Sequence, residues 1–207
     1  ARRLGAVNTL TPLTNDGWHG HNTDAEGFLA PLQEHAEEWR GSEAVVLGCG
    51  GSARAVVAGL QQLPLAAIHV AGRRPDALET FLKDLKADQS SESVQLIATA
   101  LEPEPISRVL KTSKLIVNST PVGMQGHGND RAMPLDRDLW APLDSSTTLY
   151  DLIYTPRPTP WLALGRQRGC RTIDGLEMLV QPGAASLRRW SGRTEVPVEL
   201  MRDAALR

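Results

Sequence analysis

The chain has 207 residues, of which 41% are hydrophobic and 22% are charged, and its formal net charge is −2. This composition is ordinary for a globular protein and allows one large domain, or one domain with part of another. The basic residues are spread out and no apolar run approaches the roughly 18 residues of a membrane span, so neither nucleic acid nor a membrane is an expected partner.

The first predicted element is a β-hairpin. Residues 7–13 form an expected strand, Asp16-Gly17 an expected turn, and residues 18–23 a strand that returns antiparallel. The Asp-Gly pair is a strong local signal for such a turn, because both residues tolerate positive φ angles.

A helix is predicted over residues 25–38, because apolar residues recur there at helical spacing. The polar residue before it, Thr23 or Asp24, is expected to be its N-cap. The apolar face of this helix would hold Phe28, Leu29, Leu32 and Ala36.

From residue 44 onward, short apolar runs alternate with amphipathic stretches. The alternation is typical of a parallel sheet covered by helices on both faces, so we expect an α/β fold with a Rossmann-like, doubly wound sheet. Residues 87–93 would be a polar connection and residues 123–132 a mobile loop. The expected strands are 44–47, 68–71, 94–98, 115–117, 148–152 and 171–173, and the expected helices include 52–63, 76–86 and 159–168.

The cysteines and histidines suggest no metal site. Cys49 and Cys170 lie far apart in the sequence without a CxxC motif, and the five histidines are scattered. We therefore expect reduced thiols in a cytoplasmic protein, with no disulfide and no bound metal.

A glycine-rich segment follows the strand at 44–47 and opens the next helix. Its residues fit the pattern G-x-G-x-x-A. The first glycine permits a tight turn, the second lets the backbone approach a pyrophosphate, and the small third residue lets helix and strand pack closely. The alternative is a glycine-rich turn without a ligand. The predicted dinucleotide contacts are Gly48, Gly50, Gly51, Ser52 and Ala53.

The end of the next strand discriminates between NAD and NADP. An acidic residue usually stands there in NAD sites, where it accepts hydrogen bonds from the ribose. This chain instead has Gly72-Arg73-Arg74, and two guanidinium groups can pair with a 2′-phosphate. The segment predicts NADP, the alternative being two solvated surface arginines.

Six separated segments of the chain carry a further signal. They are Gly5-Ala6-Val7-Asn8-Thr9-Leu10, Gly20-His21-Asn22-Thr23-Asp24 with Gly27-Phe28, the glycine-rich turn, Asn118-Ser119-Thr120-Pro121-Val122-Gly123-Met124, Tyr150-Asp151-Leu152-Ile153-Tyr154 with Pro156 and Thr159, and Gly175-Leu176-Glu177-Met178-Leu179. In their order and spacing they resemble the shikimate dehydrogenase family, and the similarity extends from the first residue to about Gly192.

The resemblance implies reversible reduction of 3-dehydroshikimate to shikimate with NADPH, in the pathway to the aromatic amino acids. It implies that Asp24 is the catalytic-site aspartate and that Asn8, Asp24 and Tyr154 bind the substrate. Asp24 could instead be only an N-cap, Asn8 a strand-edge residue and Tyr154 a packing aromatic. The resemblance further places Leu152, Gly175 and Met178 at the nicotinamide half of the cofactor.

The chain departs from the family pattern in two places. The family has an Asn-Val-Thr-x-Pro-x-Lys stretch before the segment at Gly5, and its lysine is the main acid–base group. The chain begins after that point, so we interpret it as a truncated member that is weakly active or inactive alone. Pro182 stands where the family has a substrate-binding glutamine. We hypothesise that Gln181 partly substitutes, with the helix either starting near Pro182 or bending there.

By analogy with the family, residues 24–174 would form the NADP-binding domain. Residues 1–23 and 175–207 would form part of the substrate domain, with Ala184, Leu187 and Trp190 mostly in the core. Exposure of part of that surface would favour association, so a homodimer is a possible assembly. The alternatives are a catalytically inactive NADP-binding or interaction module, and a quinate/shikimate dehydrogenase.

Overall fold

The computed structural model describes residues 1, 4–86, 94–128 and 130–206. The polar connection expected at 87–93 lies outside these residues. In chain order the elements are β1 (Thr9–Pro12), β2 (Trp18–His21), α1 (Asp24–Gln33), a 3₁₀ helix (Ala36–Trp39), β3 (Glu43–Leu47), α2 (Gly51–Leu60), β4 (Ala67–Gly72), α3 (Pro75–Lys86), β5 (Gln95–Ala100), α4 (Pro103–Leu110), β6 (Ser113–Asn118), a second 3₁₀ helix (Arg137–Trp140), β7 (Thr148–Asp151), α5 (Pro160–Gln167), β8 (Arg171–Ile173), α6 (Leu176–Ser191) and α7 (Val198–Ala205).

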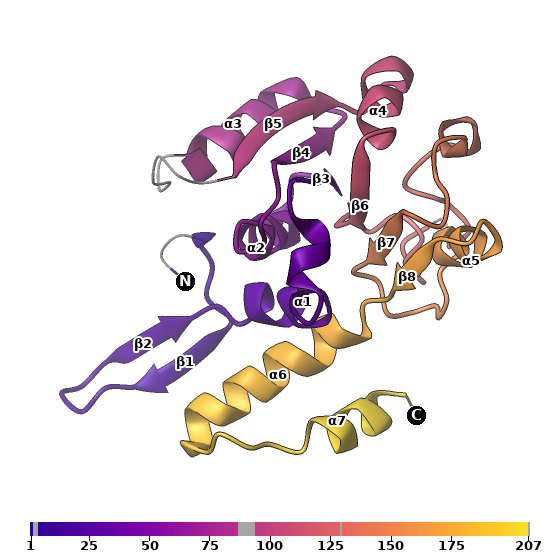
Figure 1. Cartoon of the computed structure of the whole chain (residues 1–207). Coiled ribbons are helices and arrows are strands. Elements are labelled where there is room, and N and C mark those ends of the chain that lie inside the picture. Colours follow the sequence, from indigo (N-terminus) through magenta and orange to yellow (C-terminus); the bar gives the residue numbers. More distant parts are fainter. Residues whose placement is uncertain (2–3, 87–93, 129, 207) are drawn as a thin grey trace.

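The six predicted strands from residue 44 onward form one parallel sheet in the order β5-β4-β3-β6-β7-β8. The chain runs outward from β3 to β5, then returns to place β6 on the other side of β3 (Figure 1). The predicted doubly wound α/β fold is confirmed. In such sheets ligands bind outside the carboxyl ends of the strands, at the point where the strand order reverses, which is between β3 and β6.

Helices cover both faces of this sheet. On one face α1, α2 and α3 pack against the sheet in a cluster of buried residues that includes Phe28 and Val56. On the other face α4, α5 and the second 3₁₀ helix form a cluster that includes the fully buried Trp140 and Trp161. The strands read as continuous apolar runs because both faces are buried.

Helix α1 differs from its prediction at both ends. It ends at Gln33 rather than residue 38, and a 3₁₀ helix follows in which the Trp39 indole donates to the carbonyl of Leu32 at 3.1 Å. Thr23 occupies the N-cap position, but its side chain makes no capping bond. Instead the side-chain oxygen of Asn22 accepts from the backbone N–H of Asp24 at 3.0 Å. The predicted N-cap position of Thr23 is therefore confirmed, but the side chain that bonds to the start of the helix is that of Asn22.

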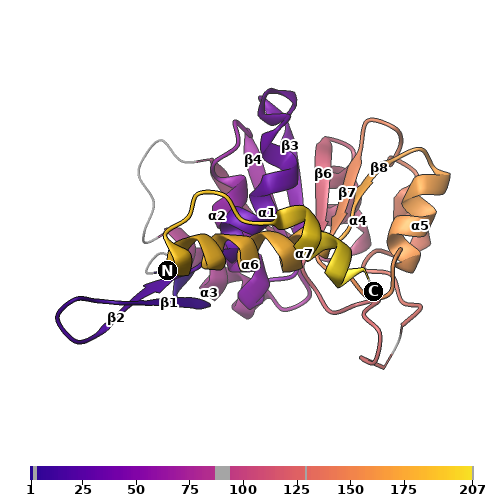
Figure 2. The same ribbon diagram turned by 90° about the horizontal axis from the view of Figure 1, so that it is seen from below.

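The predicted hairpin is confirmed, and it projects away from the parallel sheet (Figures 1 and 2). Strands β1 and β2 are antiparallel, and the turn between them uses positive φ angles at Asp16 and Gly17. Helix α6 crosses beneath α1 (Figure 2). The indole of Trp190 in α6 donates to the Leu10 carbonyl at 2.8 Å, which ties the hairpin to this helix.

Helix α6 is continuous from residue 176 to residue 191 with Pro182 inside it, so the expectation of a helix start near Pro182 is wrong. The predicted core stripe is only partly correct. Ala184 is fully buried, but Leu187 is 37% and Trp190 61% exposed. The contacts of α6 with α1 and with the residue before it are made by Pro182 and Ser186.

Residues 123–128 and 130–132 contain neither helix nor strand, as predicted for a loop. None of the helices in the described part of the chain combines the length and apolar character that a membrane span requires. The division into domains at residues 24 and 174 stays a prediction.

Candidate functional site

The glycine-rich turn sits where the sheet reverses its strand order. Gly48 has a φ of +103°, and a Cβ added to it would lie 2.8 Å from the Thr120 side chain after β6. Its N–H donates to the Ala71 carbonyl of β4 at 2.8 Å, and the N–H of Ser119 donates to the Leu47 carbonyl at 3.0 Å. Only glycine suits this position, because the conformation is left-handed and the neighbouring loop leaves no room for a side chain.

The start of α2 has the properties of an anion site. The N-cap residue is Gly50, which has no side chain that could accept a hydrogen bond from the first N–H groups of the helix. A Cβ at Gly50 or Gly51 would meet nothing within 4 Å, Ser52 is exposed, and Ala53 is fully buried against the sheet. Open space above free N–H groups at a helix start fits a phosphate.

Arg73 and Arg74 follow β4 and are both exposed. Neither forms a salt bridge with another of the described residues, so both guanidinium groups are available to a ligand. A groove of about 650 Å³ opens beside Gly72 between α3 and β5, and its charged lining residues are Glu79, Lys83 and Lys86. The two exposed guanidinium groups after β4 fit a 2′-phosphate.

The residues expected at the nicotinamide half lie at the same edge of the sheet. Leu152 follows β7, and its N–H donates to the Asn118 carbonyl at 3.1 Å. Gly175 precedes α6, its N–H donates to the Ile153 carbonyl at 3.1 Å, and a Cβ there would overlap the Leu152 carbonyl. Met178, in the first turn of α6, is partly buried against the core.

A buried carboxylate that sequence reasoning did not assign supports this edge. Asp151 is fully buried, and it accepts hydrogen bonds from Asn118 Nδ2 at 3.0 Å, Thr159 Oγ1 at 2.7 Å and the backbone N–H of Ile153 at 3.2 Å. Desolvation by burial raises the pKa of Asp151 to about 6, while these hydrogen bonds oppose the rise. Asp151 joins the loops that follow β6 and β7.

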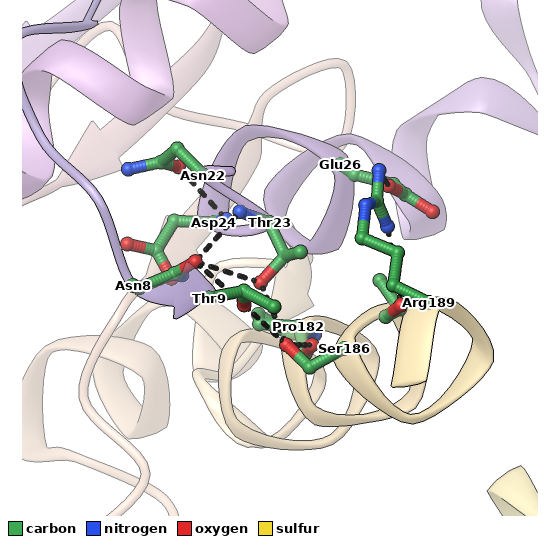
Figure 3. Close-up of polar contacts among 10 residues, drawn as sticks. Asn8, Thr9, Asn22, Thr23, Asp24, Glu26, Pro182, Ser186 and Arg189 are labelled. Carbon is green, nitrogen blue, oxygen red and sulfur yellow. Dashed lines mark hydrogen bonds and ion pairs between the residues drawn. The ribbon is translucent and has the colours of Figure 1, made fainter. Parts of the chain in front are cut away.

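Asn8 and Asp24 are brought together by the hairpin and the start of α1. Asn8 Nδ2 donates to Asp24 Oδ1 at 2.8 Å, and Asn8 Oδ1 accepts from the backbone N–H of Thr23 at 3.0 Å (Figure 3). Within the described residues Asp24 Oδ2 has no hydrogen-bond partner. This pair can therefore offer a carboxylate oxygen and an amide N–H to a hydroxylated ligand.

Three hydroxyl residues beneath this pair were missed at the level of sequence. Thr9, Thr23 and Ser186 are buried, and their side-chain oxygens connect Asn8 with α6 (Figure 3). No sequence pattern could have found Ser186, because 177 positions separate it from Thr9.

Tyr154 and Gln181 need separate mention. Tyr154 is 46% exposed, so it is not a core aromatic, and its proposed role as a substrate contact stays a prediction. Gln181 Nε2 donates to Glu177 Oε2 at 2.8 Å within α6. Arg202 of α7 binds the same carboxylate. The Gln181 amide is thus engaged on the α7 side of the helix, and we leave it out of the proposed substrate site.

The described residues contain no group of three or more His, Cys, Asp or Glu side chains that could hold a metal ion. The parallel sheet, with a glycine turn where its strand order reverses and two exposed arginines after the neighbouring strand, defines an oxidoreductase of the Rossmann type that binds a dinucleotide.

Comparison with known proteins identifies the particular family. Residues 175–206 match the family model described as the Shikimate 5'-dehydrogenase C-terminal domain. The chain is 48% identical over 206 residues to the Synechocystis sp. protein named "Shikimate dehydrogenase (NADP(+))". The matched region covers 100% of this chain and 68% of that protein. The chain belongs to the shikimate dehydrogenase family.

Solved structures agree with this assignment. A shikimate dehydrogenase in complex with NADP+ is 28% identical, with a TM-score of 0.81 over 99% of this chain and 67% of that chain. A quinate dehydrogenase from Corynebacterium glutamicum in complex with NAD is 26% identical, with a TM-score of 0.85 over 99% of this chain and 69% of that chain.

Proposed function

We propose that the protein catalyses the reversible, NADP-dependent oxidation of shikimate to 3-dehydroshikimate. The observation that carries this proposal is the paired arrangement of Asn8 and Asp24 in a chain that is 48% identical to a shikimate dehydrogenase along its whole length. The pair supplies a donor and an acceptor, which a polyhydroxylated substrate requires.

The proposed cofactor site uses residues from several strand ends. The backbone of Gly48 to Ala53 would hold the pyrophosphate at the start of α2. Gly72, Arg73 and Arg74 would hold the adenosine end with its 2′-phosphate. Leu152, Gly175 and Met178 would meet the nicotinamide half. When bound, NADP supplies the chemistry of hydride transfer.

At the substrate end, Asp24 Oδ2 would accept a hydrogen bond from a substrate hydroxyl. The second N–H of Asn8 Nδ2 would donate to the same or a neighbouring hydroxyl. Such contacts would orient the substrate beside the hydroxyl that loses its proton when it is oxidised. Tyr154 would add a contact from the loop after β7.

The replacement Asp24→Asn tests this proposal in the intact protein. NADPH formation with shikimate should fall by roughly 10²- to 10⁴-fold, while nucleotide binding measured by calorimetry stays unchanged. Glu26→Gln is the matched control, because Glu26 lies in the same first turn but pairs with Arg189 on α6.

Quinate is the second substrate to assay, because a quinate dehydrogenase shares the fold at 26% identity. We expect shikimate with NADP+ to give the highest kcat/KM among the four combinations of substrate and cofactor. A kcat/KM for quinate with NAD+ that exceeds the value for shikimate with NADP+ would assign the protein to quinate metabolism. Nucleotide binding without turnover of either substrate would instead favour a binding module.

A further inference from the structure

A set of buried hydroxyl groups connects three elements directly beneath the proposed substrate site. Thr9 belongs to β1, Thr23 precedes α1, and Ser186 lies in α6. Their fractional exposures are 1%, 0% and 7%, so none of the three exchanges its partners freely with solvent. Buried hydroxyls must satisfy their hydrogen bonds within the protein, and their arrangement is therefore specific.

Ser186 is the junction of this set. Its Oγ donates to the Pro182 carbonyl one turn earlier at 2.9 Å. Both threonine hydroxyls donate to Asn8 Oδ1, at 3.0 Å for Thr9 and 3.2 Å for Thr23. A hydroxyl has one proton, so Ser186 Oγ is the donor in its 2.5 Å contact with Thr9 Oγ1 and shares that proton with the Pro182 carbonyl. Thr23 Oγ1 lies 3.4 Å from Ser186 Oγ.

The orientation of the Asn8 amide follows from these contacts. The backbone N–H of Thr23 can only donate, so the atom of Asn8 that faces it must be the oxygen. The amide NH₂ group is consequently on the other side, where it donates to Asp24 Oδ1. The hydroxyls of Thr9 and Thr23 lie on the oxygen side of this amide and hold the side chain in that position, and Ser186 contacts both threonines (Figure 3).

We propose that Ser186 is a positioning residue that, through Thr9 and Thr23, holds the Asn8 amide toward Asp24 and so sets recognition of the substrate hydroxyls. The proposal rests on the function proposed above. It gives α6 a role in substrate recognition although the Ser186 side chain is buried and does not reach the substrate. The Pro182 carbonyl anchors the junction to the helix itself.

Steady-state kinetics of Ser186→Ala in the intact protein provide the first test. We expect KM for shikimate to rise about five- to tenfold, because one buried hydrogen bond is lost, with KM for NADP+ unchanged. Ser191→Ala is the matched control, because Ser191 Oγ makes the same kind of bond to Leu187 O at 2.7 Å but contacts none of the hydroxyl set. Equal rises in both KM values would show a merely structural role and overturn the proposal.

A double-mutant cycle that combines Ser186→Ala with Thr9→Val tests whether Ser186 acts on Asn8 through Thr9. Thr9 and Ser186 share one bond, so the double variant should lose little beyond the more damaging single variant. If the double variant instead raised KM for shikimate by the product of the two single increases, the two hydroxyls would act independently, which contradicts the proposal.

A third readout does not require activity. The side-chain amide signals of Asn8, assigned in NMR spectra by their absence in Asn8→Asp, should exchange with water faster in Ser186→Ala and remain unchanged in Ser191→Ala. Unchanged exchange in Ser186→Ala would overturn the positioning role even in an active enzyme. If the wild-type protein does not oxidise shikimate, the proposed function fails, yet this measurement still decides whether Ser186 holds Asn8.

Discussion

Gly27 of α1 lies against the ring of Pro182 in α6, and a Cβ on Gly27 would overlap that ring. The two helices can cross this closely because one of them has no side chain at the contact. Pro182 lacks the N–H that an interior helical residue normally donates, yet it is buried in this contact and α6 continues past it.

We therefore expect Gly27→Ala to lower the free energy of unfolding by roughly 1–3 kcal/mol, measured by urea denaturation. The control Gly51→Ala should not destabilise the protein, because a Cβ there meets open space. Combining Gly27→Ala with Pro182→Ala removes the ring that causes the overlap. The double variant should then be more stable than the sum of the two single effects predicts. Strict additivity would refute this packing argument.

We predict that the paired arginines after β4 determine the preference for NADP. In Arg73→Ala combined with Arg74→Ala, KM for NADP+ should rise at least about tenfold, whereas kinetics with NAD+ should change little, because only NADP carries the 2′-phosphate. Arg108→Ala is the control, since Arg108 is an exposed arginine of α4 that pairs with Glu104. Equal effects on both nucleotides would argue against this role.

Asp151 predicts an unusual dependence of stability on pH. Burial raises its pKa to about 6 in the folded protein, whereas an unfolded aspartate titrates near about 3.9. Between these pH values the folded state binds more protons than the unfolded state. The contribution of Asp151 to the free energy of unfolding is therefore fully present below about pH 4 and is lost as the pH rises through about 6.

Urea unfolding of the wild type and Asp151→Asn between about pH 4 and 7.5 tests this sign. The stability of the wild type relative to the variant should fall as the pH rises, by an amount on the order of 2 kcal/mol. Asp144→Asn should show no slope over most of this range, because hydrogen bonds from Ser146 lower the pKa of Asp144 and the group is then ionised in both the folded and the unfolded state. If the difference in the free energy of unfolding between the wild type and Asp151→Asn did not change with pH, the raised pKa of Asp151 would be contradicted.

The C-terminal helix is held by a charged contact. Arg202 of α7 binds Glu177 of α6 through two nitrogens, at 2.7 and 3.1 Å, and the side chains are only 27% and 19% exposed. Arg202→Ala should lower the free energy of unfolding by about 1 kcal/mol in urea denaturation. Arg108→Ala, which breaks an exposed pair, should stay within about 0.5 kcal/mol. Equal losses of unfolding free energy in the two variants would show that partial burial does not strengthen the ion pair between Arg202 and Glu177.

Local sequence patterns were sufficient for much of this fold. The strands of the parallel sheet, the Asp16-Gly17 turn and the glycine-rich turn at Gly48 were predictable, because apolar periodicity and turn chemistry act over a few residues. The exposed position of Arg73 and Arg74 at a strand end followed from the same alternation of strands and helices.

The sequence by itself thus determined the order of the elements and the glycine turn. Only the tertiary structure decided that Ser186 meets Thr9, that α6 passes through Pro182 against Gly27, and that Trp190 stays exposed. Each of these depends on how helices from distant parts of the chain pack together, and contacts between distant residues leave no periodic trace in a single sequence. The burial that raises the pKa of Asp151 has the same origin, because it comes from neighbouring loops and strands rather than from the residues beside it in the chain.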